Sequence, residues 1–161
     1  MNEVNGRRRP EPSDRGAVAV EFALVAPLVL FLLFAMIGYG YMLSFRQAIS
    51  QAAAEGARAA AVAPAALSDA DVKSRARTAI NDALGSYDVT CTSAGLLMKG
   101  TANAGTCVIS APQTCTTSTI GAKCVKVTLD YTYADDSLLP SPGLGILLPE
   151  HLNYSSEVQV S

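Results

Sequence analysis

The chain has 161 residues, a formal net charge of −2, 50% hydrophobic residues and no tryptophan. A weakly acidic chain provides no general electrostatic field for nucleic acid, so we expect no nucleic-acid partner. About 115 residues remain once a leader and one apolar span are set aside, which is enough for one small domain and not for two.

The N-terminal part combines a charged leader with a long apolar run. Residues 1–16 are rich in charged residues, Gly and Pro and show no apolar periodicity, which predicts an unstructured leader. No residue from Phe22 to Phe45 is charged, and a helix over this run would be about 36 Å long. A bilayer core is about 30 Å thick, so we predict a transmembrane helix over residues 17–45. Three aromatic residues would form an interfacial belt at its outer end: Tyr39, Tyr41 and Phe45.

The distribution of arginines predicts the orientation of this single-pass span. Four arginines precede it, whereas only Arg46 and Arg58 follow it closely. Positive charge is retained on the cytoplasmic side, so the N-terminus should be cytoplasmic and the C-terminal domain outside. The four cysteines then lie on the outer side, where disulfides are permitted: Cys91, Cys107, Cys115 and Cys124.

One acidic residue stands at the entrance of the apolar run. Glu21 is the fifth residue after Gly16, and a carboxylate at such a depth is costly and usually functional. Glycine would let a peptidase approach the Gly16–Ala17 bond closely. After cleavage, Glu21 of one subunit, with Phe22 beside it, could neutralise the new amino terminus of a neighbour and set the register of assembly. The alternative is an interfacial carboxylate that reaches into the headgroup layer beside Arg15.

Beyond the span the helix should continue as a stalk over residues 46–64, ending at Pro64. A polar stripe follows helical spacing along it: Gln47, Gln51, Glu55 and Arg58. Small apolar residues fill the other faces, which would allow tight packing against other helices: Ala48, Ile49, Ala52, Ala53, Ala59 and Ala60.

The remaining residues, 65–161, predict a small α+β domain. A second helix should begin at the capping residue Ser68 and end at Gly85. One face of it is apolar, and its basic residues would form a solvated face or, alternatively, contact anionic lipid: Lys73, Arg75 and Arg77.

Alternating residues predict an antiparallel sheet in this domain. Short strands are expected at residues 87–91 and 106–110, separated by a loop rich in Gly, Ala and Thr. The clearest strand runs from Lys123 to Tyr133, and a last strand, Leu152 to Val160, should pair with it antiparallel.

The four cysteines favour two disulfides over a zinc site, because there is no Cys-x-x-Cys and no histidine near them. We favour the pairs Cys91–Cys107 and Cys115–Cys124, although the sequence does not decide among the three connectivities. His151, the only histidine, has no second base or nucleophile motif near it. We therefore expect no catalytic residue, no cofactor and no bound metal.

The N-terminal pattern resembles a type IV prepilin signal and, more closely, the TadE-like pilus assembly proteins of tight-adherence (Flp-type) systems. The resemblance rests first on the run from Arg15 to Pro27, RGAVAVEFALVAP. It continues in Arg46-Gln47-Ala48 and in Ala54-Glu55-Gly56-Ala57-Arg58-Ala59. The segments 125–133 and 144–149 of the tail are also similar, whereas the cysteine-containing middle is not.

The resemblance implies a pseudopilin or minor pilin of the bacterial cytoplasmic membrane, with a pilin-like α+β fold. Its expected partners are membrane lipid, a prepilin peptidase that cuts between Gly16 and Ala17, and the pilus secretion machinery. It would assemble with other pilins as a homo- or hetero-oligomer in a filament. The rival interpretation is an uncleaved signal-anchor protein whose outer domain binds a wall component, a ligand or a partner protein. Removal by ordinary signal peptidase and an enzymatic function are weaker alternatives.

Overall fold

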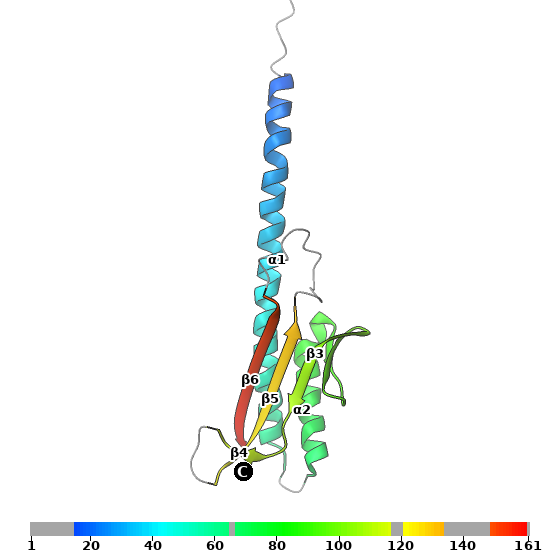
Figure 1. The fold of residues 1–161 in the computed structure, drawn as a ribbon, viewed down its shortest axis with the longest axis vertical. Coiled ribbons are helices and arrows are strands. Elements are labelled where there is room, and N and C mark those ends of the chain that lie inside the picture. The colour runs from blue at the N-terminus through cyan, green and yellow to red at the C-terminus, as the bar shows by residue number, and fades with distance from the viewer. Residues whose placement is uncertain (1–14, 65–66, 117–120, 134–148, 161) are drawn as a thin grey trace, which may run out of the picture. The chain divides into compact units, whose positions relative to one another are not determined.

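The computed structural model describes residues 15–64, 67–116, 121–133 and 149–160. It contains two α-helices, α1 (Arg15–Ala61) and α2 (Asp69–Leu84), and a short 3-10 turn, η1 (Gly85–Tyr87). The strands of its sheet are β1 (Val89–Cys91), β2 (Leu96–Lys99), β3 (Ala102–Ile109), β4 (Gln113–Thr114), β5 (Lys123–Thr132) and β6 (His151–Val160). This arrangement confirms the predicted α+β class, with a long N-terminal helix, a second helix and an antiparallel sheet (Figure 1).

Internal contacts divide the chain into two units, Met1–Ile37 and Gly38–Ser161. The described part of the first unit is the N-terminal half of α1. The second unit contains the C-terminal half of α1, together with α2 and all the described strands. The division predicted from the sequence, into residues 1–16, 17–45, 46–64 and 65–161, stays a prediction.

The ends of both helices follow from local sequence. Helix α1 ends at Ala61, slightly before the predicted Pro64, because a proline disfavours the helical conformation in the residue that precedes it. Helix α2 has the predicted N-cap, since the Ser68 hydroxyl accepts a hydrogen bond from the Asp71 amide at 3.2 Å. Gly85 follows its last residue, as predicted.

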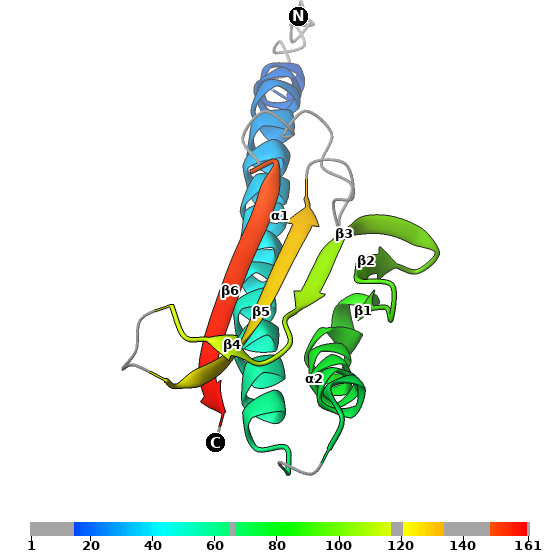
Figure 2. The same ribbon diagram turned by 60° about the horizontal axis from the view of Figure 1, so that its bottom comes forward.

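Strand β5 is the centre of the sheet. It pairs antiparallel with β3 and with β4, and along its whole length with β6, from Lys123–Val160 to Thr132–His151. This confirms the predicted pairing of the two C-terminal strands. Figure 2 shows β5 between β6 and β3, with both α2 and the C-terminal half of α1 on the same face of the sheet.

The sequence missed one strand. Residues 96–99, expected in a loop, form β2, which pairs with both β1 and β3. The run is short and apolar between Gly95 and Gly100, and Leu97 is fully buried. Two tight turns therefore separate three strands where small residues had suggested one long loop.

The core of the second unit joins α1, α2 and one face of the sheet. From α1 it contains Met42, Phe45, Ile49, Ala52, Ala53 and Ala57. Facing them from β5 are Val127, Leu129 and Tyr131. The small residues of the predicted stalk thus pack within their own domain, while Gln47, Gln51, Glu55 and Arg58 are exposed on the other side as predicted.

Phe45 corrects the prediction of an interfacial aromatic belt. Its side chain is fully buried, with its ring centroid 4.8 Å from that of Tyr131 and 5.0 Å from that of Tyr87. Edge-to-face aromatic packing of this kind adds stability beyond the apolar area that it buries. Phe45 therefore belongs to the domain core, whereas Tyr39 is 54% exposed.

Two disulfides close the domain. Cys91 of β1 is bonded to Cys107 of β3, and Cys115 after β4 is bonded to Cys124 of β5. These are the two pairs that the sequence favoured, and the described residues contain no free cysteine.

Candidate functional site

The predicted cleavage site lies in the first turn of α1. Gly16 and Ala17 are exposed, and a Cβ built on Gly16 would meet no atom within 4 Å. No described part of the chain therefore shields this peptide bond.

Glu21 lies one turn further along α1 and is also exposed. Residues four apart share a face of a helix, so Ala17 and Glu21 are on the same side. Because α1 rises about 1.5 Å per residue, the carboxylate and the Ala17 nitrogen are separated by about 6 Å along the helix axis. Among the described residues, Glu21 has no hydrogen-bond or ion-pair partner. Phe22 beside it is 72% exposed.

The residues that follow Glu21 present an apolar surface on every side. The best membrane-spanning window of α1 has a mean hydropathy of 2.6 and none of it is buried. This is the one helix in the described part of the chain that is long and apolar enough to cross a membrane. Its exposed large residues include Leu24, Leu28, Phe31, Phe34, Met36 and Ile37.

The segment after the span has two different faces. Glu55 and Arg58 are exposed and form an ion pair with 3.9 Å between Oε2 and Nη1. Gly56, between them in sequence, is buried, and a Cβ at this position would lie 2.7 Å from Cγ1 of Ile80. The glycine therefore permits the close approach of α1 and α2, a role that the sequence pattern alone did not reveal.

The N-terminal pattern also matches a known family. The sequence model described as TadE-like protein matches residues 16–58, which include Gly16, Glu21 and the Gly56 segment. The chain carries a TadE-like segment. This confirms the resemblance identified from these residues, and the tail segments fall outside the match. Comparisons with curated proteins and with solved structures gave no match.

The TadE-like segment suggests a role in tight-adherence pilus assembly, as a structural component that interacts with other pilus proteins. This segment contains the exposed apolar stretch of α1, residues 16–37, and the residues that α1 contributes to the domain core, from Met42 to Ala57. The assignment of Gly16, Ala17, Glu21 and Phe22 to cleavage and assembly stays a prediction.

Other ionisable groups lie on the sheet, outside this segment of the sequence. The Asn153 amide donates to the Asp130 carboxylate at 2.8 Å, and Nδ1 of His151 lies 2.9 Å from the other oxygen. The hydrogen bond from Asn153, followed by that from His151, holds the pKa of Asp130 below its usual range. Thr116 similarly lowers the pKa of Glu157, first through its hydroxyl and then through its amide.

One cluster of potential metal ligands occurs among the described residues, formed by Cys115, Cys124 and Glu157. Its two sulfur atoms are bonded to each other, and both carboxylate oxygens of Glu157 accept hydrogen bonds from Thr116. A disulfide offers no thiolate to a metal, so we assign this cluster to the structure of the domain.

Proposed function

We propose that this chain is a membrane-anchored pseudopilin or minor pilin of a tight-adherence pilus. The observation that carries the proposal is the exposed apolar stretch of α1, residues 16–37, whose single carboxylate is Glu21 and which lies within a TadE-like segment. The chain would act as a structural subunit and as the substrate of a prepilin peptidase that cuts between Gly16 and Ala17.

We further propose that the chain crosses the bacterial cytoplasmic membrane once, with its N-terminus in the cytoplasm. The excess of arginine before the span supports this orientation. The two disulfides of the C-terminal domain support it as well, since they are stable in an oxidising compartment.

Glu21 provides the basis for a mechanism of assembly. Cleavage would create a positively charged amine at Ala17, about one helical turn from the Glu21 carboxylate of the same chain. When parallel helices of neighbouring subunits pack together, the amine of one can pair with the carboxylate of the next. A charge left unpaired in an apolar bundle is strongly destabilising, so this pairing would favour one axial register over others.

Cleavage is tested by intact-mass analysis of protein extracted from the membranes of a strain that carries the pilus system. We expect a chain that begins at Ala17, and a full-length chain for Gly16→Leu. Wild-type protein that retains residues 1–16 would instead support the uncleaved signal anchor.

The role of Glu21 is tested by comparing Glu21→Gln with the control Glu55→Gln, since both carboxylates are exposed on α1. Recovery of the chain with co-assembled pilins, measured after crosslinking, should fall at least about tenfold for Glu21→Gln. Glu55→Gln should stay within about twofold of wild type. The amount of each variant in the membrane should be equal. Equal recovery of both variants would contradict the register mechanism.

A further inference from the structure

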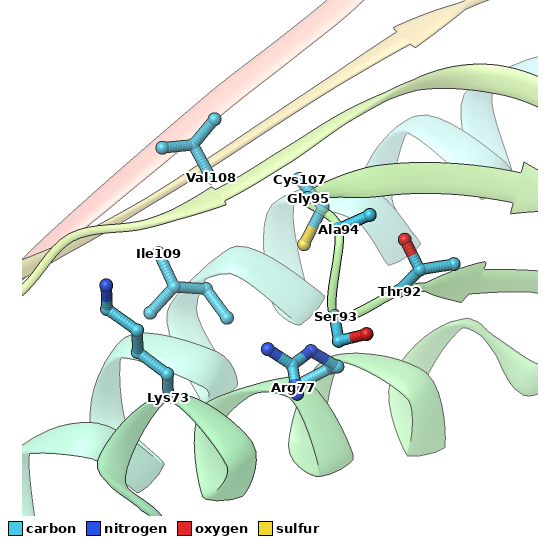
Figure 3. A pocket seen from close by; sticks show the side chains of 9 residues that line it. All are labelled: Lys73, Arg77, Thr92, Ser93, Ala94, Gly95, Cys107, Val108 and Ile109. Carbon is cyan, nitrogen blue, oxygen red and sulfur yellow. The ribbon is translucent and has the colours of Figure 1, made fainter. Parts of the chain in front are cut away.

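A pocket in the C-terminal domain lies outside the TadE-like segment and has no part in the proposed assembly. Its volume is about 320 Å³, and its walls come from α2, from the turn between β1 and β2, and from β3. Figure 3 shows two basic side chains, Lys73 and Arg77, on the α2 side of this pocket.

The two basic residues are placed unfavourably unless an anion accompanies them. Lys73 and Arg77 are four residues apart on α2, so their like charges share one face of the helix and repel each other. Both are partly buried, whereas Arg75 on the same helix is exposed. Neither Lys73 nor Arg77 forms an ion pair with a carboxylate of the described residues.

Arg77 also has an unused hydrogen-bond donor. Its Nε atom is buried and has no hydrogen-bond partner among the described residues. Buried donors in proteins are nearly always paired, because an unpaired one loses its interaction with water without compensation. An acceptor that enters the pocket would satisfy it.

The opposite wall is a fixed turn with a polar side chain. Figure 3 shows Ser93 directly across from Arg77. The Gly95 amide donates to the Thr92 carbonyl at 3.1 Å, and the Cys107 amide donates to the Gly95 carbonyl at 2.9 Å. The disulfide Cys91–Cys107 holds the two strands beside this turn. The wall is therefore arranged before any ligand arrives, which reduces the entropy lost on binding.

The remaining wall is apolar. Ile109 of β3 points into the pocket, whereas the neighbouring Val108, 55% exposed, points to the opposite side of the strand (Figure 3). Ile109 provides a surface for the carbon skeleton of a ligand whose charged group lies against α2.

We propose that this pocket binds a phosphate group carried by a small organic molecule or a lipid headgroup. Two cations and a hydroxyl can each contact a different oxygen of one phosphate group, whether it is a doubly charged monoester or the singly charged phosphodiester of a lipid, whereas a carboxylate offers only two oxygens. The planar guanidinium of Arg77 and the ammonium of Lys73 are the donors that proteins commonly use for phosphate. Ser93 supplies a further hydroxyl donor for a third oxygen.

The test uses the full chain, labelled with ¹⁵N, in a neutral detergent. Inorganic phosphate is added at constant ionic strength, with sodium chloride as the exchanged salt, and the Nε–H signal of Arg77 and the Ser93 amide signal are followed. We expect saturable shifts of both signals. Acetate at the same concentrations should bind more weakly than phosphate.

Three variants sharpen the result. Arg77→Gln and Lys73→Gln should each weaken phosphate binding about tenfold, because each removes a charge-assisted hydrogen bond. The matched control Arg75→Gln should stay within about twofold of wild type. If Arg77→Gln does not fold, as judged by the dispersion of its amide spectrum, Lys73→Gln decides, since the buried unpaired donor belongs to Arg77 and not to Lys73.

A second arm separates the two sources of phosphate. In phosphatidylglycerol nanodiscs without added phosphate, a shift of the Arg77 signal identifies a lipid headgroup as the ligand. If the Arg77 signal does not shift in the nanodiscs but shifts saturably with inorganic phosphate in detergent, the ligand is a soluble molecule. Three outcomes would overturn the proposal. The shifts could grow linearly with phosphate concentration, chloride could reproduce them, or Arg75→Gln could reduce them as much as Arg77→Gln does.

Discussion

Residues 16–37 and residues 38–61 belong to one helix, yet their surroundings differ completely. In the first stretch Phe22 is 72% exposed and Leu24 is 75% exposed, and no residue contributes to a core within the chain. In the second, Phe45 and Ile49 are fully buried against α2 and the sheet. The apolar side chains of the second stretch are therefore covered by the rest of the domain. The exposed apolar surface of the first stretch is of the kind that lipid or other subunits cover.

This difference separates two kinds of substitution. Changes at buried positions within residues 38–161 should alter the free energy of unfolding of the domain. Changes in residues 16–37 should leave that free energy unchanged and, under the proposed function, affect assembly alone. The four predictions below test this separation, starting from the largest expected effect.

The substitution Phe45→Ala should destabilise the domain by about 3–5 kcal/mol, because it leaves a cavity among closely packed aromatic rings. The matched substitution Phe22→Ala, in the exposed stretch, should change the free energy of unfolding by less than about 0.5 kcal/mol. Urea unfolding in a neutral detergent, followed by the near-ultraviolet circular dichroism of tyrosine, measures both. Similar losses for the two variants would mean that the first stretch also takes part in the core.

Removal of the disulfide Cys91–Cys107 should cost about 3 kcal/mol, as expected for a loop closed by residues 16 apart. Alanine is the appropriate replacement, because both cysteines are buried and serine would bury an unpaired hydroxyl. Urea unfolding of the double alanine variant measures the loss. Membrane insertion, measured as the amount of extracted protein, should not change, and a parallel fall in insertion would contradict the separation of the two units.

The substitution Gly56→Val should destabilise the domain by about 1–3 kcal/mol, since even the first added carbon would lie 2.7 Å from Ile80, which is itself fully buried. Gly40→Ala is the control, because a Cβ at Gly40 meets nothing within 4 Å. Differential scanning calorimetry in detergent should show a lower Tm for Gly56→Val only. An unchanged Tm for Gly56→Val would show that α1 and α2 separate at little cost.

The sequence predicted the parts of this fold that depend on local signals. Each of these signals is contained in a few consecutive residues. They are the Ser68 cap, the alternation of apolar and polar residues from Val125 to Tyr133, and the TadE-like pattern around Gly16 and Glu21. The cysteine pairs could be favoured because their spacing fits short hairpin-like closures.

Features that depend on distant contacts were not predicted. Phe45 ends an uncharged run and has the same local pattern as a residue that faces lipid. Only the approach of Tyr87 and Tyr131 from elsewhere in the chain makes it a core residue. The pocket beside Arg77 was missed for the same reason, since Ser93 and Ile109 come from other elements and the helix alone suggests a solvated basic face.

The smallest expected effect concerns acid stability and the exposed face of the sheet. Hydrogen bonds from Asn153 and then from His151 keep the pKa of Asp130 below the usual value of 3.8, so the folded state favours its ionised form. A lowered pKa contributes stability above the unfolded value, and this contribution is lost as the pH falls through the folded pKa. For such a surface group the contribution should be below about 1 kcal/mol. The pKa of Glu157 is lowered by its hydrogen bonds from Thr116, so this group also favours the folded state above that pKa and ceases to do so in acid.

The variant Asp130→Asn isolates this effect. Thermal unfolding between pH 6 and pH 3 should show a smaller decrease in Tm for Asp130→Asn than for wild type, because the variant has one less carboxylate to protonate. Glu21→Gln is the comparison from the exposed stretch of α1, and its decrease should equal that of wild type, since Glu21 has no hydrogen-bond or ion-pair partner among the described residues. If Glu21→Gln flattened the acid dependence as much as Asp130→Asn, the domain would depend on the N-terminal stretch for its stability. The contrast between a self-sufficient domain and a helix that requires partners would then have to be abandoned.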